Sequence, residues 1–282
     1  YVQVKLTVVP PGRVDAVVPR ISEYANTQNK VSAADFFSNH PFHLRIEEMS
    51  RRLWAPSADG AFVETHWFYE RARGQYANAQ ANLSLAQQKK FLTQFPKHQM
   101  FTKTDLAKFE YSMGMKPHVV SYGAQKSFAA FAEDIGGKWE KNNEQFSEHF
   151  FKELIAKAIV FRFLDREVMK QSWYGGYKAN IVAYSIAKLA HMVSGINARL
   201  NLEAIWRKQS LSPAFEQQLV TIAEQVNTAI QVMPDGAMNV TEWCKRESCW
   251  SSIQRLQIPL SEDLRTELIS IEDAKYIERG AE

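Results

Sequence analysis

The stretch FFKELIAKAIVFRFL, residues 150–164, decides the fold class. Its apolar residues recur at helical spacing and cover most of the helix circumference rather than a single stripe. A helix of that kind is buried on several sides. A second stretch of the same character, IVAYSIAKLAHMV, follows at residues 181–193. The two stretches predict a central helical hairpin over about residues 147–194, with an aromatic tip at residues 173–177.

Amphipathic patterns extend the helical prediction on both sides of this hairpin. Residues 215–230 and 241–257 each show one apolar face, and the latter carries Trp243 and Trp250 seven positions apart. Residues 1–9 instead alternate apolar and polar side chains, which predicts a half-buried strand. The expected fold is therefore mainly α: a multi-helix array around the central hairpin, with a short N-terminal β element.

The domain prediction divides the chain into an N-terminal segment, 1–145, with the short strand and helices, and a helical core with C-terminal helices, 146–282. One continuous domain is the alternative. The N-terminal segment carries a slight basic surplus: of the 34 Lys and Arg and the 31 Asp and Glu residues of the chain, residues 1–150 hold 18 and 15, whereas the rest holds 16 of each. That balance is too even to identify a nucleic-acid-binding protein by charge alone.

Composition excludes several classes of protein. A hydrophobic fraction of 45% is typical of a globular chain, and no apolar run is long enough for a membrane span. Two cysteines and no signal peptide predict a cytoplasmic protein with reduced thiols. The chain starts at Tyr1, inside a strand pattern and without Met, so we expect it to be part of a longer protein whose upstream domain is one partner.

The segment WFYERARGQY, residues 67–76, is the densest candidate for ligand contact. Arginine guanidinium groups suit phosphate, and aromatic rings can stack on bases. From Tyr69 onward the spacing favours a helix in which Tyr69, Arg73 and Tyr76 share a face. Helix starts elsewhere, with Thr104 as an expected N-cap, add further anion-binding candidates. The candidate residues for nucleic-acid or anion binding are Arg71, Arg73, Tyr69, Tyr76, Lys103, Ser121 and Lys126.

Two alternatives stay open for this segment. Aromatic residues at helical spacing are often core residues, and arginines near Glu64 and Glu70 often form structural ion pairs. A protein interface is the other alternative, and its candidate residues are Asn26, Gln28, Asn29, Tyr174 and Tyr177.

Motifs for known catalytic chemistry are absent. The chain has no phosphate-binding loop, no dinucleotide-binding loop and no serine-hydrolase elbow. His40 and His43 lack further ligands at a zinc-site spacing, and Cys244 and Cys249 lack a second pair. No metal and no cofactor are therefore predicted. A hydrolase would need Glu64, His66, Arg71 or Asp105 to converge in one pocket.

Six segments carry a resemblance to a known family over about residues 1–257: Asn26–Asn29, Trp67–Tyr76, Phe101–Lys108, Pro117–Lys126, Trp173–Tyr177 and Asn239–Lys245. In this order they resemble the AIPR family, the abortive infection phage resistance proteins of bacteria, whose members are longer. The resemblance implies that this chain is their C-terminal part and that its role is antiviral defence. It brings no list of catalytic residues, and any nuclease-like part would lie upstream.

Three functions follow as hypotheses. The first is a module of a phage-defence protein that contacts DNA or RNA through the arginine and aromatic residues. The second is a protein-interaction or regulatory module that senses a phage protein or mediates self-association. The third is a nuclease-like hydrolase whose site the sequence does not identify.

Overall fold

The structure is a computed structural model that describes residues 6–25, 37–57 and 64–271. Its helices are η1 (Pro11–Arg13), α1 (Val14–Ala25), α3 (Pro41–Arg52), α4 (Gln75–Asn78), α5 (Leu85–Gln94), η3 (Lys97–Gln99), α6 (Lys103–Met113), α7 (Pro117–Val120), α8 (Ala124–Lys141), α9 (Glu148–Glu167), η4 (Val168–Lys170), α10 (Lys178–Gly195), α11 (Leu202–Lys208), α12 (Pro213–Gln231), α13 (Val240–Trp243), α14 (Glu247–Gln254) and α15 (Glu262–Arg265). Its strands are β1 (Phe68–Glu70), β2 (Met100–Thr102), β3 (Ala198–Arg199) and β4 (Ile269–Ser270). The prediction of a mainly α fold is confirmed.

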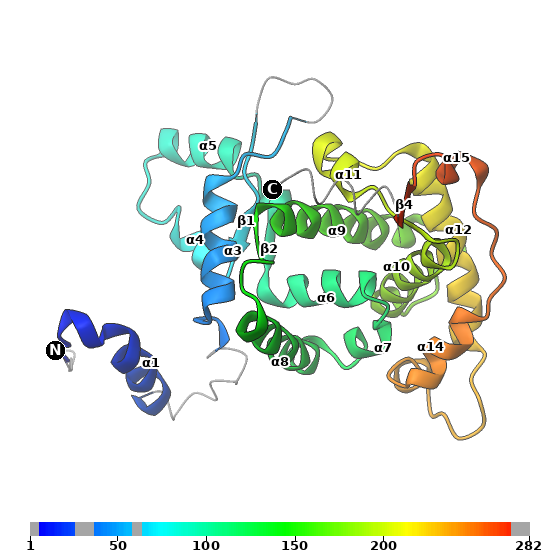
Figure 1. Cartoon of the computed structure of the whole chain (residues 1–282), viewed down its shortest axis with the longest axis horizontal. Coiled ribbons are helices and arrows are strands. Elements are labelled where there is room, and N and C mark those ends of the chain that lie inside the picture. The colour runs from blue at the N-terminus through cyan, green and yellow to red at the C-terminus, as the bar shows by residue number, and fades with distance from the viewer. Residues whose placement is uncertain (1–5, 26–36, 58–63, 272–282) are drawn as a thin grey trace.

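The central hairpin is α9 and α10, and it lies in the middle of the helical body (Figure 1). Helix α9 packs against α6, α10, α11 and α12, which explains why its sequence is apolar around most of its circumference. The predicted hairpin is therefore confirmed. None of the helices in the described ranges combines the length and the apolar character that a membrane span requires.

One hydrophobic core extends from Phe42 on α3 to Leu264 on α15. Helices α6 and α8 contribute to it together with α9 and α10. Within this core, α10 buries the ammonium group of Lys188, which donates hydrogen bonds of 2.8 and 2.7 Å to the carbonyl oxygens of Gln254 and Leu256. Burial lowers the pKa of Lys188. Those two bonds tie α10 to the end of α14.

The strands form only a small part of the fold, and they lie outside the N-terminal region in which the sequence predicted a strand. β1 and β2 pair in parallel, with Phe68 opposite Met100, and β3 pairs with β4 in antiparallel orientation. The predicted N-terminal β element is wrong as far as it is described, because residues 6–10 belong to no strand. Leu6 and Val8 are 86% and 85% exposed, so the alternating pattern buries neither side chain. Residues 1–5 lie outside the described residues.

The predicted helix over residues 241–257 is divided into α13 and α14. The extended backbone of Arg246, with φ −90° and ψ 138°, separates them. Trp243 and Trp250 are nevertheless both buried in the core. The apolar pattern therefore identified the buried residues but not the break, which no proline or glycine marks.

The N-cap of α6 is Thr102 rather than the predicted Thr104. The Thr102 hydroxyl accepts a hydrogen bond from the Asp105 amide, and the Asp105 carboxylate accepts one from the Thr102 amide at 3.1 Å. This reciprocal arrangement is a capping box with Asp in the place of Glu. Burial alone would raise the pKa of Asp105, but Lys108 and the hydrogen bonds of Thr102 lower it.

Because the cap residue satisfies helix amides that otherwise have no partner, Thr102→Ala should lower the free energy of unfolding by about 1 kcal/mol. Thr104→Ala should change it by less than about 0.5 kcal/mol, since its side chain caps no amide. Urea denaturation of both variants checks the assignment. If Thr104→Ala lowers the free energy of unfolding more than Thr102→Ala does, Thr104 is the N-cap and the assignment is wrong.

Candidate functional site

The segment Trp67–Tyr76 forms strand β1, a turn and the start of α4, so the predicted helix from Tyr69 onward is wrong. Gly74 causes the turn, because it adopts φ 87°, a left-handed conformation that favours glycine. The Glu70 carboxylate then accepts hydrogen bonds from the amides of Gly74 at 3.1 Å and Tyr76 at 3.0 Å. Glu70 therefore fixes the turn instead of pairing with an arginine along a helix.

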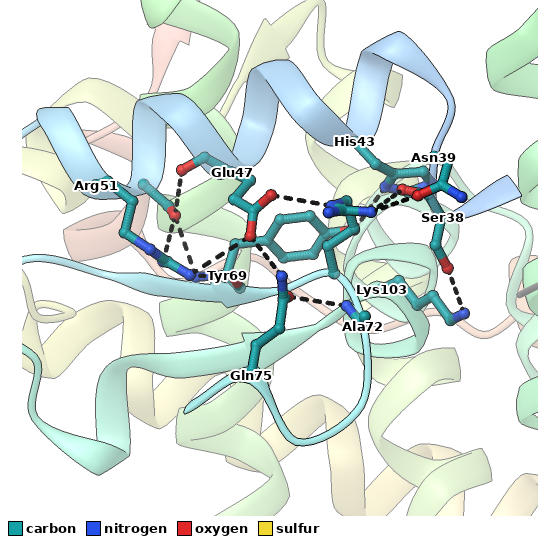
Figure 2. Close-up of polar contacts among 11 residues, drawn as sticks. Ser38, Asn39, His43, Glu47, Arg51, Tyr69, Ala72, Gln75 and Lys103 are labelled. Carbon is teal, nitrogen blue, oxygen red and sulfur yellow. Dashed lines mark hydrogen bonds and ion pairs between the residues drawn. The ribbon is translucent and has the colours of Figure 1, made fainter. Parts of the chain in front are cut away.

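Arg71 is bound by other parts of the protein. Its Nε donates to Glu47 on α3 at 2.9 Å, and its terminal nitrogen donates to the Ser38 carbonyl at 3.1 Å and to Asn39 Oδ1 at 2.8 Å. Glu47 also accepts a hydrogen bond of 2.7 Å from Gln75, which lies just after the turn, as Figure 2 shows. These contacts hold the turn against α3.

A second arginine, Arg51 on α3, adds to this junction between α3 and the segment Trp67–Tyr76. It donates to the Tyr69 carbonyl at 3.1 Å, and its guanidinium carbon lies 3.4 Å from the centroid of the Phe68 ring. Burial lowers the pKa of Arg51 to about 10, although Glu47 acts in the opposite direction. Arg51 and Arg71 both pair with Glu47, and together these contacts attach α3 to β1 and to the turn that follows it.

Beneath this junction Tyr69 and His43 are fully buried, and the Tyr69 hydroxyl lies 2.5 Å from His43 Nδ1 (Figure 2). Burial lowers the pKa of His43 to about 3, and the positive charges of Lys103 and Arg71 and the neighbouring His40 act in the same direction. Burial also raises the pKa of Tyr69 well above its usual value. The pair is therefore neutral at physiological pH.

The predicted ligand-binding residues separate into two groups. Tyr69, Arg71 and Lys103 lie around His43, and Arg71 and Lys103 also donate to the carbonyl and the hydroxyl of Ser38, the latter at 2.7 Å. Tyr76 is buried as well, and its hydroxyl donates to the Phe95 carbonyl at 2.6 Å. Neither tyrosine ring is accessible to a base in this arrangement.

The remaining residues of that prediction lie elsewhere. Arg73 is exposed at the turn before α4, and Lys126 is exposed in the first turn of α8. Ser121 ends α7, where its hydroxyl donates to the Pro117 carbonyl at 3.1 Å and accepts from Asn180 at 2.9 Å. The structure therefore does not gather the predicted residues into one surface.

The predicted interaction residues are partly described. Asn26, Gln28 and Asn29 lie outside the described residues. Tyr174 is half-buried against the core, whereas Tyr177 is exposed and precedes α10 with a left-handed φ of 60°. The aromatic tip thus presents one of its two tyrosine side chains mainly to the core and the other to the surface.

A cavity of about 500 Å³ opens beside Trp67. We call it the Gln99 cavity. Its lining residues include an apolar wall, two arginines, a glutamate and an amide side chain: Trp67, Gln99, Ile159, Arg162, Arg166, Leu211 and Glu216. They come from η3, α9, α12 and the loops that precede β1 and α12, so segments that are far apart in the sequence form the cavity.

Arg162 organises the wall of the Gln99 cavity. Its guanidinium donates to the carbonyl oxygens of His98 and Met100 and lies 5.2 Å from the centroid of the Trp67 ring. The indole nitrogen of Trp67 in turn donates to Gln209 Oε1 at 2.8 Å. Burial lowers the pKa of Arg162, and burial together with the charge of Arg162 lowers that of His98. Arg162 therefore holds η3 and β2 in place and adds positive charge to the cavity.

The mouth of the cavity carries opposite charges. The Arg166 side chain is 67% exposed and lies one helical turn after Arg162 on α9, beside Glu167 at 3.2 Å. Glu216 lies on α12, and burial and the charge of Glu167 raise its pKa, while Arg166 lowers it. Counting Arg162, Arg166 and Glu216 as ionised, the lining has a net charge of +1.

A family model described as AIPR protein matches residues 1–234 of the chain. The chain belongs to the AIPR family. Its role is therefore in abortive infection, that is, in defence against phage. The comparisons with curated proteins and with solved structures found no match.

In this AIPR chain, the residues named for a hydrolase do not converge. His66 Nδ1 lies 2.9 Å from the Leu53 carbonyl, Arg71 is paired with Glu47, and Asp105 caps α6. Cys244 and Cys249 are buried free thiols. No group of three His, Cys, Asp or Glu residues in the described ranges is placed to hold a metal ion.

Sequence reasoning missed Gln99, Arg162 and Arg166 as candidates in this AIPR chain. One signal for Arg162 was available, because it interrupts the apolar stretch of residues 150–164. A buried charge needs partners, and such residues often mark sites. Gln99 has no comparable signal, since a glutamine in a polar loop sequence is usually exposed.

Proposed function

We propose that this chain is the recognition module of a phage-defence protein and that it contacts a nucleic-acid strand at the mouth of the Gln99 cavity. The observation that carries the proposal is the pair of arginines, Arg162 and Arg166, one turn apart on α9 beside an aromatic wall. Guanidinium groups bind phosphate with several donors at once. Arg162 is held by backbone carbonyls, whereas Arg166 is exposed and able to meet a phosphate.

This location replaces the one that the sequence favoured. Arg71 already donates to Glu47, Ser38 and Asn39, and the nearby tyrosines are buried. A ligand there would have to displace structural contacts first. At the Gln99 cavity, by contrast, the Arg166 side chain is 67% exposed and its ion-pair partner Glu167 is also held by Lys170 at 2.6 Å, so a phosphate that binds Arg166 leaves Glu167 paired.

Arg166→Ala should weaken binding to single-stranded DNA or RNA about 5- to 10-fold at low salt, because one charge-assisted phosphate contact is lost. The slope of log affinity against log salt concentration should also fall by about 0.7. Fluorescence anisotropy with labelled oligonucleotides over a salt series measures both values.

The matched control is Arg207→Ala, since Arg207 is 73% exposed on α11 and pairs with Glu203 as Arg166 pairs with Glu167. It should bind like the unmodified protein. An Arg73→Ala variant tests the alternative surface before α4. If Arg73→Ala weakens binding and Arg166→Ala does not, the contact lies at the turn; if the unmodified protein binds no oligonucleotide, the proposed function is wrong.

A further inference from the structure

A column of three aromatic rings, Trp54, His66 and Phe95, reaches the surface at its outer end. The centroid of the Trp54 ring lies 3.7 Å from that of His66, and the His66 centroid lies 4.9 Å from that of Phe95. His66 is 5% exposed, whereas Trp54 is 45% exposed. The inner rings therefore hold the indole of Trp54 in place and leave part of its surface open to solvent.

The backbone places this aromatic column next to the Gln99 cavity. Ala55 pairs with Thr65 in an antiparallel bridge, so the two segments that carry Trp54 and His66 are joined directly beside these rings. Thr65 lines the cavity, and so do residues 56–57. The exposed indole therefore belongs to the surface that adjoins the cavity.

The inner end of the aromatic column is attached to α5, at the edge of the molecule (Figure 1). The His66 amide donates to the Gln94 carbonyl, the last residue of α5, at 2.7 Å. Lys90 lies about one helical turn before Gln94, and Lys97 follows it by three residues at the start of η3. Both lysines are exposed, so an ammonium group flanks the column on each side along the chain.

This part of the chain is strongly basic. Residues 71–104 contain six Lys and Arg residues and no Asp or Glu. Glu64, which is exposed beside Thr65, adds a single negative charge next to the column. The surface around α5 and η3 is therefore net positive and complementary to a polyanion.

We infer that a single strand of nucleic acid crosses this surface, with one base stacked on the exposed part of the Trp54 ring and its backbone phosphates near Lys90 and Lys97. Unpaired bases stack on aromatic side chains while basic residues follow the backbone. In a duplex the bases are stacked on one another, so their flat faces are closed to Trp54. The inference rests on the proposed contact with nucleic acid and specifies it: the ligand is single-stranded, and its sequence matters little because every base has a flat face.

Trp54→Leu tests the stacking contact. It should weaken binding to a single-stranded oligonucleotide about 5- to 20-fold in fluorescence anisotropy, whereas Trp54→Phe should retain most of the affinity because it keeps a flat ring. Tyr122→Leu is the matched control, since Tyr122 is 39% exposed between α7 and α8, away from α5. It should bind like the unmodified protein.

An oligonucleotide with abasic sites separates stacking from a structural role of Trp54. Without bases it should bind the unmodified protein and Trp54→Leu equally. If Trp54→Leu weakens binding of the abasic strand as much as that of the ordinary strand, the indole only supports the fold of this surface, and the inference is overturned.

The lysines are tested by their contribution to the salt dependence. Lys90→Gln together with Lys97→Gln should lower the slope of log affinity against log salt concentration by about 1.4, that is, about 0.7 for each phosphate contact. Lys138→Gln together with Lys141→Gln removes two exposed lysines from α8 and should leave the slope unchanged. Equal slopes for the two double variants would contradict the path of the strand along α5 and η3.

Failure of this inference differs from failure of the proposed function. If Arg166→Ala weakens binding and Trp54→Leu does not, the strand contacts the cavity mouth and the stacking site is wrong. If Trp54→Leu weakens binding and Arg166→Ala does not, the stacking site stands and the contact at the cavity mouth is wrong. Binding of polyglutamate with the affinity of the oligonucleotide at the same salt concentration would overturn both, because the surface would then take any polyanion.

Discussion

Lowering the pH from about 6.5 to about 3 is expected to remove about 4 to 5 kcal/mol of folding free energy through His43 alone, since one pKa unit corresponds to about 1.4 kcal/mol. The folded protein keeps this buried ring neutral down to about pH 3. The unfolded chain takes up the proton near pH 6.5. Between these values the unfolded state binds more protons, so stability decreases as the pH falls. Above about pH 6.5 the contribution of His43 is constant.

The effect of His43 can be separated from that of the other histidines by a paired substitution. His43→Leu together with Tyr69→Phe removes both partners of the buried hydrogen bond and leaves no unpaired hydroxyl. Urea denaturation at several pH values between 4 and 7 should show a flatter dependence for this variant. His149→Gln changes a half-exposed histidine and serves as the control. Equal pH dependence in the unmodified protein and the double variant would contradict the assignment.

Replacing Arg71 with alanine is expected to lower the free energy of unfolding by about 2 to 4 kcal/mol. The substitution removes hydrogen bonds to Glu47, Ser38 and Asn39 and leaves Glu47 with one close partner fewer. The side chains of Arg71 and Glu47 are only 17% and 21% exposed, so water replaces the lost contacts poorly. The loss should therefore exceed that of an ordinary surface ion pair, about 0 to 1 kcal/mol.

Arg73 provides the matched control, because it is two residues away in the same turn and exposed. Arg73→Ala should change the free energy of unfolding by less than about 0.5 kcal/mol. A double-mutant cycle of Arg71→Ala with Glu47→Ala measures the coupling between the two side chains. If Arg71→Ala is as stable as Arg73→Ala, the network around Glu47 does not stabilise the fold, and a ligand-binding role for Arg71 becomes the better explanation.

The local spacing of apolar residues was sufficient to predict most of the helices. The apolar stretch at residues 150–164 predicted a helix buried on several sides, and α9 is such a helix. Alternation at the N-terminus was misleading, because Leu6 and Val8 find no packing partner and remain exposed. A strand needs a neighbouring strand to satisfy its backbone, and the alternating pattern alone does not supply one.

The candidate sites were less predictable because they depend on contacts between distant residues. Arg71 meets Glu47 across 24 positions, and Arg162 meets the carbonyls of His98 and Met100 across 64 and 62 positions. No spacing rule for a single helix or strand covers such distances. The segment Trp67–Tyr76 holds many aromatic and arginine side chains, but its conformation depends on Gly74 and on the carboxylate of Glu70, which its helical spacing did not indicate.

The sequence by itself determined the helical class, the central hairpin and, through its resemblance, membership of the AIPR family. These properties are carried by local periodicity and by motifs, which a linear chain displays directly. Only the tertiary structure decided which arginines are engaged and which are accessible. Arg71 and Arg73 are equivalent as residues, yet one is enclosed by α3 and the other faces solvent. Burial and pairing depend on what other parts of the chain place nearby, and so does the location of the cavity beside Gln99.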